Sequence, residues 1–131
     1  MGRRRVKLAD LQLAIMQVLW DREEAAVAEV REALEPRHSV AHTTVATMLS
    51  RMEADGYVAH RSEGRANIYR PKLGREDAGQ SMVSDMAERL FRGDRAQMMT
   101  HLLAGSEITP DELARLKKLV RDKESELRHG Q

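Results

Sequence analysis

The sequence contains no cysteine, which excludes disulfide bonds and metal sites built on thiolates. Aromatic residues are scarce, with one Trp, one Phe and two Tyr among 131 residues. No apolar run approaches the roughly 20 residues that a membrane-spanning helix needs. These absences predict a soluble, cytoplasmic protein without membrane insertion, and a core made of aliphatic and methionine side chains.

The usual signatures of catalysis are missing as well. The sequence has no phosphate-binding loop, nucleophile elbow or HExxH motif. Its histidines have neither the i, i+4 pairing nor the cysteine companions that make metal ligands, and we interpret them as structural or exposed; they are His38, His42, His60, His101 and His129. We therefore expect no enzyme activity, no metal and no cofactor.

The net charge of +1 carries little information, but the charges are segregated along the chain. Residues 37–72 contain six Lys or Arg against three Asp or Glu, whereas residues 21–35 contain two against six. Basic residues therefore concentrate in one stretch of the chain, where a nucleic acid could bind.

That stretch, Ser39 to Pro71, is the one around which we expect the chain to be organised. It begins with an i, i+3, i+4, i+7 apolar stripe, which predicts a helix with one face in a core; the stripe is Val45, Met48, Leu49 and Met52. Gly56 suits the left-handed position that ends a helix.

The opposite face of this helix is small, hydroxylated and singly cationic. At about 100° per residue, the face consists of Thr43, Thr47 and Ser50, with Thr44, Ala46 and Arg51 on its flanks. A solvated face is normally rich in Glu and Lys, whereas a helix entering the DNA major groove needs short groups and few acids. We favour groove binding over a plain exposed face.

Two runs with β propensity follow, Tyr57–Arg61 and Ala66–Arg70, and predict a hairpin. Residues 62–65 join them, and Gly64 can supply a positive φ there. Arg61, Arg65 and Arg70 lie along the hairpin and are suited to phosphate contacts, although exposed hairpins also carry charge to block edge pairing.

Upstream, the apolar pattern predicts two further helices. The first has an inward stripe of Leu8, Leu11, Ile15, Val18 and Leu19, and a second apolar face of Leu13, Met16 and Trp20. Ala25 and Ala26 allow a minimal strand, and a short helix then ends before Pro36. Helix, short helix, longer helix and hairpin is the winged helix-turn-helix order, preceded by a mobile basic arm, residues 1–7.

After Pro71 the pattern predicts three amphipathic helices. The last has a clear start, because Thr109, Pro110 and Glu112 form a capping box with Pro at the first helical position. A region this small, with one aromatic residue, buries little surface alone, so we expect dimerisation. The expected contacts are Met82, Met86, Leu90, Met98, Met99, Leu102, Leu103, Leu113, Leu116 and Val120. The alternative is that these helices fold back on the first domain.

Several segments together resemble the penicillinase-repressor family of BlaI, MecI and CopY type. These segments are LADLQLAIMQVLW, VAEVREAL, HTTVATMLSRMEADGYV and the hairpin closing on YRP. The resemblance implies a bacterial, dimeric repressor that binds palindromic operators through its third helix and is released by an inducing signal. Its partners would be operator DNA, a second copy and a membrane metalloprotease sensor.

Family members can be induced by proteolytic cutting in the helix that corresponds to residues 94–104, and the resemblance places the bond at His101-Leu102. Relatives known for cleavage carry a different residue pair. Thr43 and Ala46 stand where some relatives have longer basic side chains, so bidentate guanine contacts from these positions are excluded. Ala9 replaces a Thr or Ser N-cap, which leaves the start of the first helix open.

The sequence thus predicts a mainly α protein, with a winged helix-turn-helix DNA-binding domain over residues 8–72 and a helical dimerisation domain over residues 73–131. The rival hypothesis is a protein-interaction module that uses the same fold without DNA. The operator, the regulated genes and the inducer do not follow from the sequence.

Overall fold

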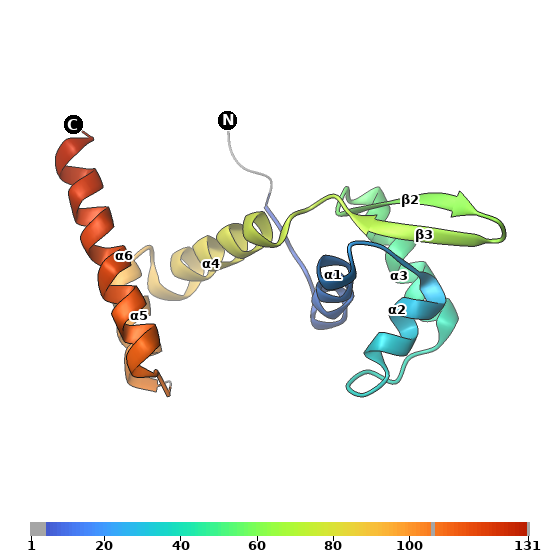
Figure 1. Cartoon of the computed structure of the whole chain (residues 1–131), viewed down its shortest axis with the longest axis horizontal. Coiled ribbons are helices and arrows are strands. Elements are labelled where there is room, and N and C mark those ends of the chain that lie inside the picture. Colours follow the sequence, from blue (N-terminus) through green and yellow to red (C-terminus); the bar gives the residue numbers. More distant parts are fainter. Residues whose placement is uncertain (1–4, 106, 131) are drawn as a thin grey trace. The chain divides into compact units, whose positions relative to one another are not determined.

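The computed structural model describes residues 5–105 and 107–130 of the chain. The elements follow one another as α1 (Asp10–Arg22), β1 (Ala25–Ala26), α2 (Val27–Leu34), α3 (His42–Ala54), β2 (Val58–Glu63), β3 (Ala66–Pro71), α4 (Arg75–Phe91), α5 (Arg95–Gly105) and α6 (Pro110–His129) (Figure 1). The chain divides into two compact units, and the division falls inside α4, after Asp85. The mainly α prediction is confirmed.

In the first unit, α1, α2 and α3 surround a single apolar core. Its fully buried side chains include Ile15, Met16, Leu19, Val30, Val45, Leu49 and Met52. Both predicted faces of α1 contribute, because Met16 is buried and Trp20 packs against the same core. The start of α1 is now defined: Ala9 is its N-cap, and the Ala9 amide donates to the Gln12 side chain over 2.9 Å.

The three strands form one antiparallel sheet in the order β1-β3-β2. The minimal strand predicted at Ala25 and Ala26 is present and pairs with Tyr69 and Ile68 of β3. The hairpin differs from the prediction, because β2 continues to Glu63 and only Gly64 and Arg65 form the turn. Gly64 has a φ of 61°, which permits this two-residue connection.

The predicted basic arm lies partly outside the described residues, which begin at Arg5. Its described end packs into the first unit. The Val6 side chain is in the core, and its amide donates to the Ser81 hydroxyl over 3.1 Å. The next amide, of Lys7, donates to the Tyr57 hydroxyl over 3.2 Å. An apolar residue within the basic run therefore fixes the backbone.

The predicted domain boundary lies between residues 72 and 73, whereas the first unit continues into α4. Leu73 and Ala78 are buried in the core of the first unit, and Met82 packs against it. The first half of α4 therefore packs on the winged helix. The second half, from Met86, belongs to the second unit.

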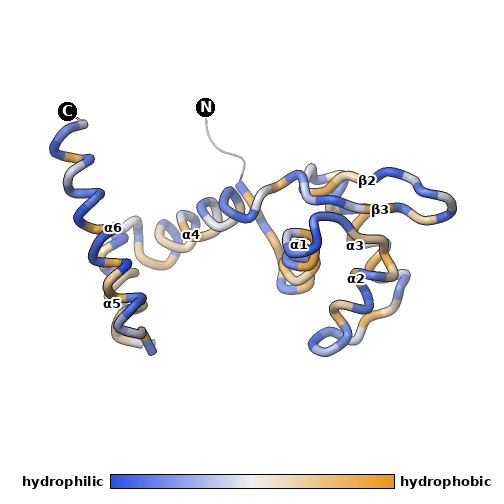
Figure 2. Tube along the Cα trace, viewed as in Figure 1, coloured by the Kyte–Doolittle hydropathy of each residue, from blue (hydrophilic) through white to orange (hydrophobic). Residues whose placement is uncertain are grey.

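The second unit buries little. Neither α5 nor α6 has a buried residue among those described. The capping box of α6 is present as predicted: the Glu112 amide donates to Thr109 Oγ1 over 3.1 Å, and the Thr109 amide donates to Glu112 Oε1 over 3.0 Å. Figure 2 shows α6 as mainly hydrophilic with recurring hydrophobic bands. None of the described helices is long and apolar enough to cross a membrane.

Candidate nucleic-acid interface

The outer face of α3 lies where the apolar stripe predicted it. Val45, Leu49 and Met52 are buried, which turns the opposite side of the helix to solvent. The predicted groove-facing residues are exposed, except for Ala46, which is half-buried; the exposed ones are Thr43, Thr44, Thr47, Ser50 and Arg51. The first turn of α3 contains no acidic residue.

A hollow of about 260 Å³ lies along this face. Its lining residues are Thr43, Thr44, Thr47, Met48 and Arg51. Met48, which the apolar stripe predicted to face the core, is half-buried; it packs against the core and also borders the hollow. Three hydroxyls and one guanidinium therefore line the hollow together with the apolar Met48 side chain. Such a surface can contact polar groups and methyl groups of one ligand.

These polar groups are available to an external partner. Within the described part of the chain, the side chains of Thr43, Thr44, Thr47 and Arg51 have no hydrogen-bond or ion-pair partner. A threonine hydroxyl can donate one hydrogen bond and accept two, and a guanidinium carries five donors. The face can therefore bind a ligand rich in both acceptors and donors without first breaking internal contacts.

The acid on α3, Glu53, lies near the end of the helix and is bonded to His60. Glu53 Oε1 lies 2.7 Å from His60 Nδ1, and this contact joins the end of α3 to β2. The His60 ring in turn lies 5.2 Å from the Tyr69 ring. Burial raises the pKa of Tyr69, and the negative charge of Glu53 raises it further. The cluster ties the end of α3 to the sheet.

The hairpin places Arg65 at its tip. Of the two turn residues only Gly64 has a positive φ, the pattern of a type II′ turn, which lets the strands pair as far as Glu63 and Ala66. Arg65 and Arg70 are exposed and have no acidic partner among the described residues. Both cations are therefore able to contact phosphate groups.

Arg61, the third arginine of the hairpin, differs. Its Nη1 donates to Glu63 over 2.6 Å and its Nη2 donates to Glu24 over 2.9 Å. These bonds, to Glu63 and then to Glu24, raise the pKa of Arg61. The sequence prediction grouped Arg61 with Arg65 and missed Glu24, because only the pairing of β1 with β3 brings residue 24 beside the hairpin.

The predicted dimerisation residues fall into three environments. Met82 packs against the first unit, and Met98 and Leu116 are half-buried in the second. The remaining ones are exposed; they are Met86, Leu90, Met99, Leu102, Leu103, Leu113 and Val120. Every exposed large apolar side chain that the structure describes lies between Val83 and Leu127. The predicted cleavage residues His101 and Leu102 are both exposed on α5.

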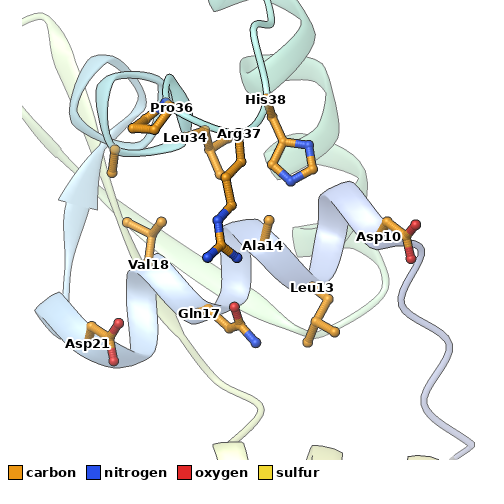
Figure 3. A pocket seen from close by; sticks show the side chains of 11 residues that line it. Asp10, Leu13, Ala14, Gln17, Val18, Asp21, Leu34, Pro36, Arg37 and His38 are labelled. Carbon is orange, nitrogen blue, oxygen red and sulfur yellow. The ribbon is translucent and has the colours of Figure 1, made fainter.

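A separate hollow of about 510 Å³ lies between α1 and the turn after α2. Figure 3 shows the Arg37 side chain reaching from this turn toward α1, with His38 beside it. The hollow shares no lining residue with the outer face of α3. Over residues 5–105 and 107–130, no three His, Asp or Glu side chains gather as metal ligands would. The outer face of α3 therefore remains the candidate site.

Three helices, a small sheet with a projecting hairpin and an acid-poor third helix define a winged-helix protein of the DNA-binding class. Comparison with known proteins identifies the family. Residues 8–122 match the penicillinase repressor family. The chain therefore belongs to the penicillinase repressor family, whose members are transcriptional repressors and not enzymes.

Individual relatives agree with this assignment. The chain is 34% identical over 122 residues to the transcriptional regulator BlaI of Mycobacterium tuberculosis, covering 91% of this chain and 86% of that protein. It is 23% identical over 116 residues to the penicillinase repressor of Bacillus licheniformis, covering 88% and 91%. The solved DNA-binding domain of the repressor BlaI matches with a TM-score of 0.51 and 28% identity, over 58% of this chain and 93% of that structure. The winged-helix prediction is confirmed.

Proposed function

We propose that this protein is a homodimeric transcriptional repressor that binds palindromic operator DNA through α3 and the β2–β3 hairpin. The observation that carries the proposal is the outer face of α3, where hydroxyls and Arg51 without a partner in the described chain line a hollow, and an arginine-bearing hairpin follows α3 in the same unit. A member of the penicillinase repressor family with such a face has the chemistry to read a DNA groove.

The short side chains of α3 allow close approach to base edges. Threonine and serine hydroxyls can bond to donors or acceptors of any base pair, and threonine methyl groups can contact the thymine methyl. Arg51 is long enough for a bidentate contact with guanine, whereas Thr43 and Ala46 are not. Sequence reading would then rest on Thr43, Thr44, Thr47, Ser50 and Arg51.

The hairpin would set the docking position. Phosphate contacts orient a protein on the duplex without reading sequence, and each neutralised phosphate releases condensed counterions. Arg65 at the tip and Arg70 on β3 are exposed and lack acidic partners in the described chain. DNA affinity should therefore fall steeply as salt increases.

Homodimerisation is supported by the apolar surface of the second unit. Leu90 is 67% exposed and Val120 58% exposed, and large exposed apolar patches mark interaction sites. Between α5 and α6 lies a hollow of about 400 Å³, lined by Met99, Leu103, Leu113, Leu116 and Val120 with Lys117 and Arg121 at its rim. A second copy would cover this surface and supply the missing core.

Induction would act on α5. The His101-Leu102 bond lies in the middle of this helix, and both side chains are exposed. A protease binds its substrate as an extended strand, so α5 would have to unwind, and a helix that buries no residue opens at low cost. The resemblance to the family points to a membrane metalloprotease sensor as the partner for this route.

The decisive experiment is operator binding by the intact protein. Fluorescence anisotropy should show tight binding to DNA from the promoter of its own gene. The logarithm of the binding constant should fall linearly with the logarithm of the salt concentration. Scrambled DNA of equal length and composition should bind at least about a thousandfold more weakly, the lower end for specific DNA-binding proteins. Equal binding to both DNAs would contradict the proposal of a sequence-specific repressor.

A further inference from the structure

Arg61 occupies the centre of a charge cluster that crosses the sheet. On β2 it pairs with Ile68 of β3, and Ile68 also pairs with Ala26 of β1. Because side chains alternate between the faces of a strand, the Arg61 side chain lies on the face opposite to buried Val58. Glu24, the second residue before Ala26, reaches the same face and bonds to Arg61.

The two acids occupy both terminal nitrogens of the guanidinium. Glu63 accepts from Nη1 over 2.6 Å, and Glu24 accepts from Nη2 over 2.9 Å. These are the nitrogens that would otherwise bind a phosphate. One positive and two negative charges also give the cluster a net charge of −1, which repels a phosphate at the same place.

The other arginines of the hairpin lack such acids within the described residues. Arg65 and Arg70 are exposed without an ion-pair partner there. All three pairing groups of the cluster are about half exposed, between 47% and 65% for their side chains. Exposed pairs of this kind are weak, so the Arg61 cluster can be opened by a modest change in charge.

We propose that Glu24 and Glu63 set the DNA affinity of the hairpin by holding Arg61 away from phosphate, so that removal of either acid adds Arg61 to the phosphate contacts. The proposal rests on the proposed DNA-binding function and concerns one residue of that same interface. Glu24 and Glu63 act as positioning residues, since they reach the DNA only through Arg61.

The first test compares three isosteric variants on one operator DNA. Glu24→Gln and Glu63→Gln should each tighten binding by about two- to fivefold, the range that an exposed ion pair can account for. Each should also steepen the salt dependence by about 0.9 in the slope of log K against log salt, which is one added phosphate contact. Glu35→Gln is the matched control, because Glu35 is an exposed acid without a bond to Arg61.

The second test asks whether the increase in DNA affinity depends on Arg61. Arg61→Ala alone removes no phosphate contact but leaves Glu24 and Glu63 without their cation, so it should weaken DNA affinity by less than Arg65→Ala does. In the Arg61→Ala background, Glu24→Gln should increase DNA affinity less than it does when Arg61 is present, and it should not steepen the salt dependence. Thermal melting of each variant by circular dichroism separates changes in folding from changes in binding.

Three results would overturn the inference. One is a Glu24→Gln variant whose DNA affinity rises no more than that of the control, and another is an increase in affinity that is just as large without Arg61. The third is an Arg61→Ala variant that loses as much affinity as Arg65→Ala, which would mean that Arg61 already binds phosphate. Each requires operator binding by the wild type, so a wild type that binds no DNA refutes the proposed function instead.

Discussion

The indole Nε1 of Trp20 donates a hydrogen bond of 2.8 Å to the backbone carbonyl of Leu73. This bond joins the last turn of α1 to the connection between β3 and α4. The Arg75 guanidinium lies 5.4 Å from the centre of the indole ring and also donates to Asp21 over 2.8 Å. The single tryptophan therefore fixes the connection at which the chain leaves the winged helix.

Trp20→Phe should destabilise the first unit by about 1–2 kcal/mol, because the Leu73 carbonyl would lose its donor in a partly buried position. Urea unfolding followed by circular dichroism measures this change. Arg75→Ala is the matched control, and it should cost less than about 1 kcal/mol because its ion pair is exposed. Equal stability of Trp20→Phe and wild type would show that the bond contributes nothing.

Thr47→Glu should abolish specific operator binding while the protein stays folded. Thr47 is exposed on α3, so the change disturbs no core contact, but a carboxylate there would face base edges and phosphates. Gln80→Glu places the same charge on the exposed surface of α4 and should bind normally. Wild-type affinity for the folded Thr47→Glu variant would remove α3 from the interface.

Arg65→Ala should weaken binding to all DNA sequences about equally and reduce the salt slope by about 0.9, the loss of one phosphate contact. Titrations of operator and scrambled DNA at several salt concentrations give both quantities. Arg128→Ala, a charge-matched change near the end of α6, should leave the slope unchanged. A loss confined to the operator would instead mean that Arg65 reads bases.

Leu102→Asp should yield monomers, because it places a charge on the apolar surface that we assign to the dimer. Light scattering measures the mass, and operator affinity should fall by about a hundredfold as the two half-sites no longer bind as one event. Gln97→Asp, an exposed change on the same helix, should remain dimeric. A Leu102→Asp protein that is still a tight dimer would place the interface elsewhere.

Much of the fold follows from local sequence. The limits of α2, α3 and α6 are encoded by apolar periodicity and by short-range signals such as Gly56, the Thr109–Glu112 capping box and Pro110. The outer face of α3 is predictable for the same reason, since a helix with one buried stripe must expose the opposite side. Such features depend on residues within about one turn of each other.

The sequence by itself therefore determined the helices, the winged-helix class and the residues on the outer face of α3. Tertiary structure alone decided that Val6 enters the core, that α4 begins on the first unit and that Glu24 neutralises Arg61. These contacts join residues far apart in the chain, so the apolar periodicity of a single helix or strand does not predict them. Glu24 and Arg61 are 37 positions apart and meet only because β1 pairs with β3, which brings residue 24 beside the hairpin.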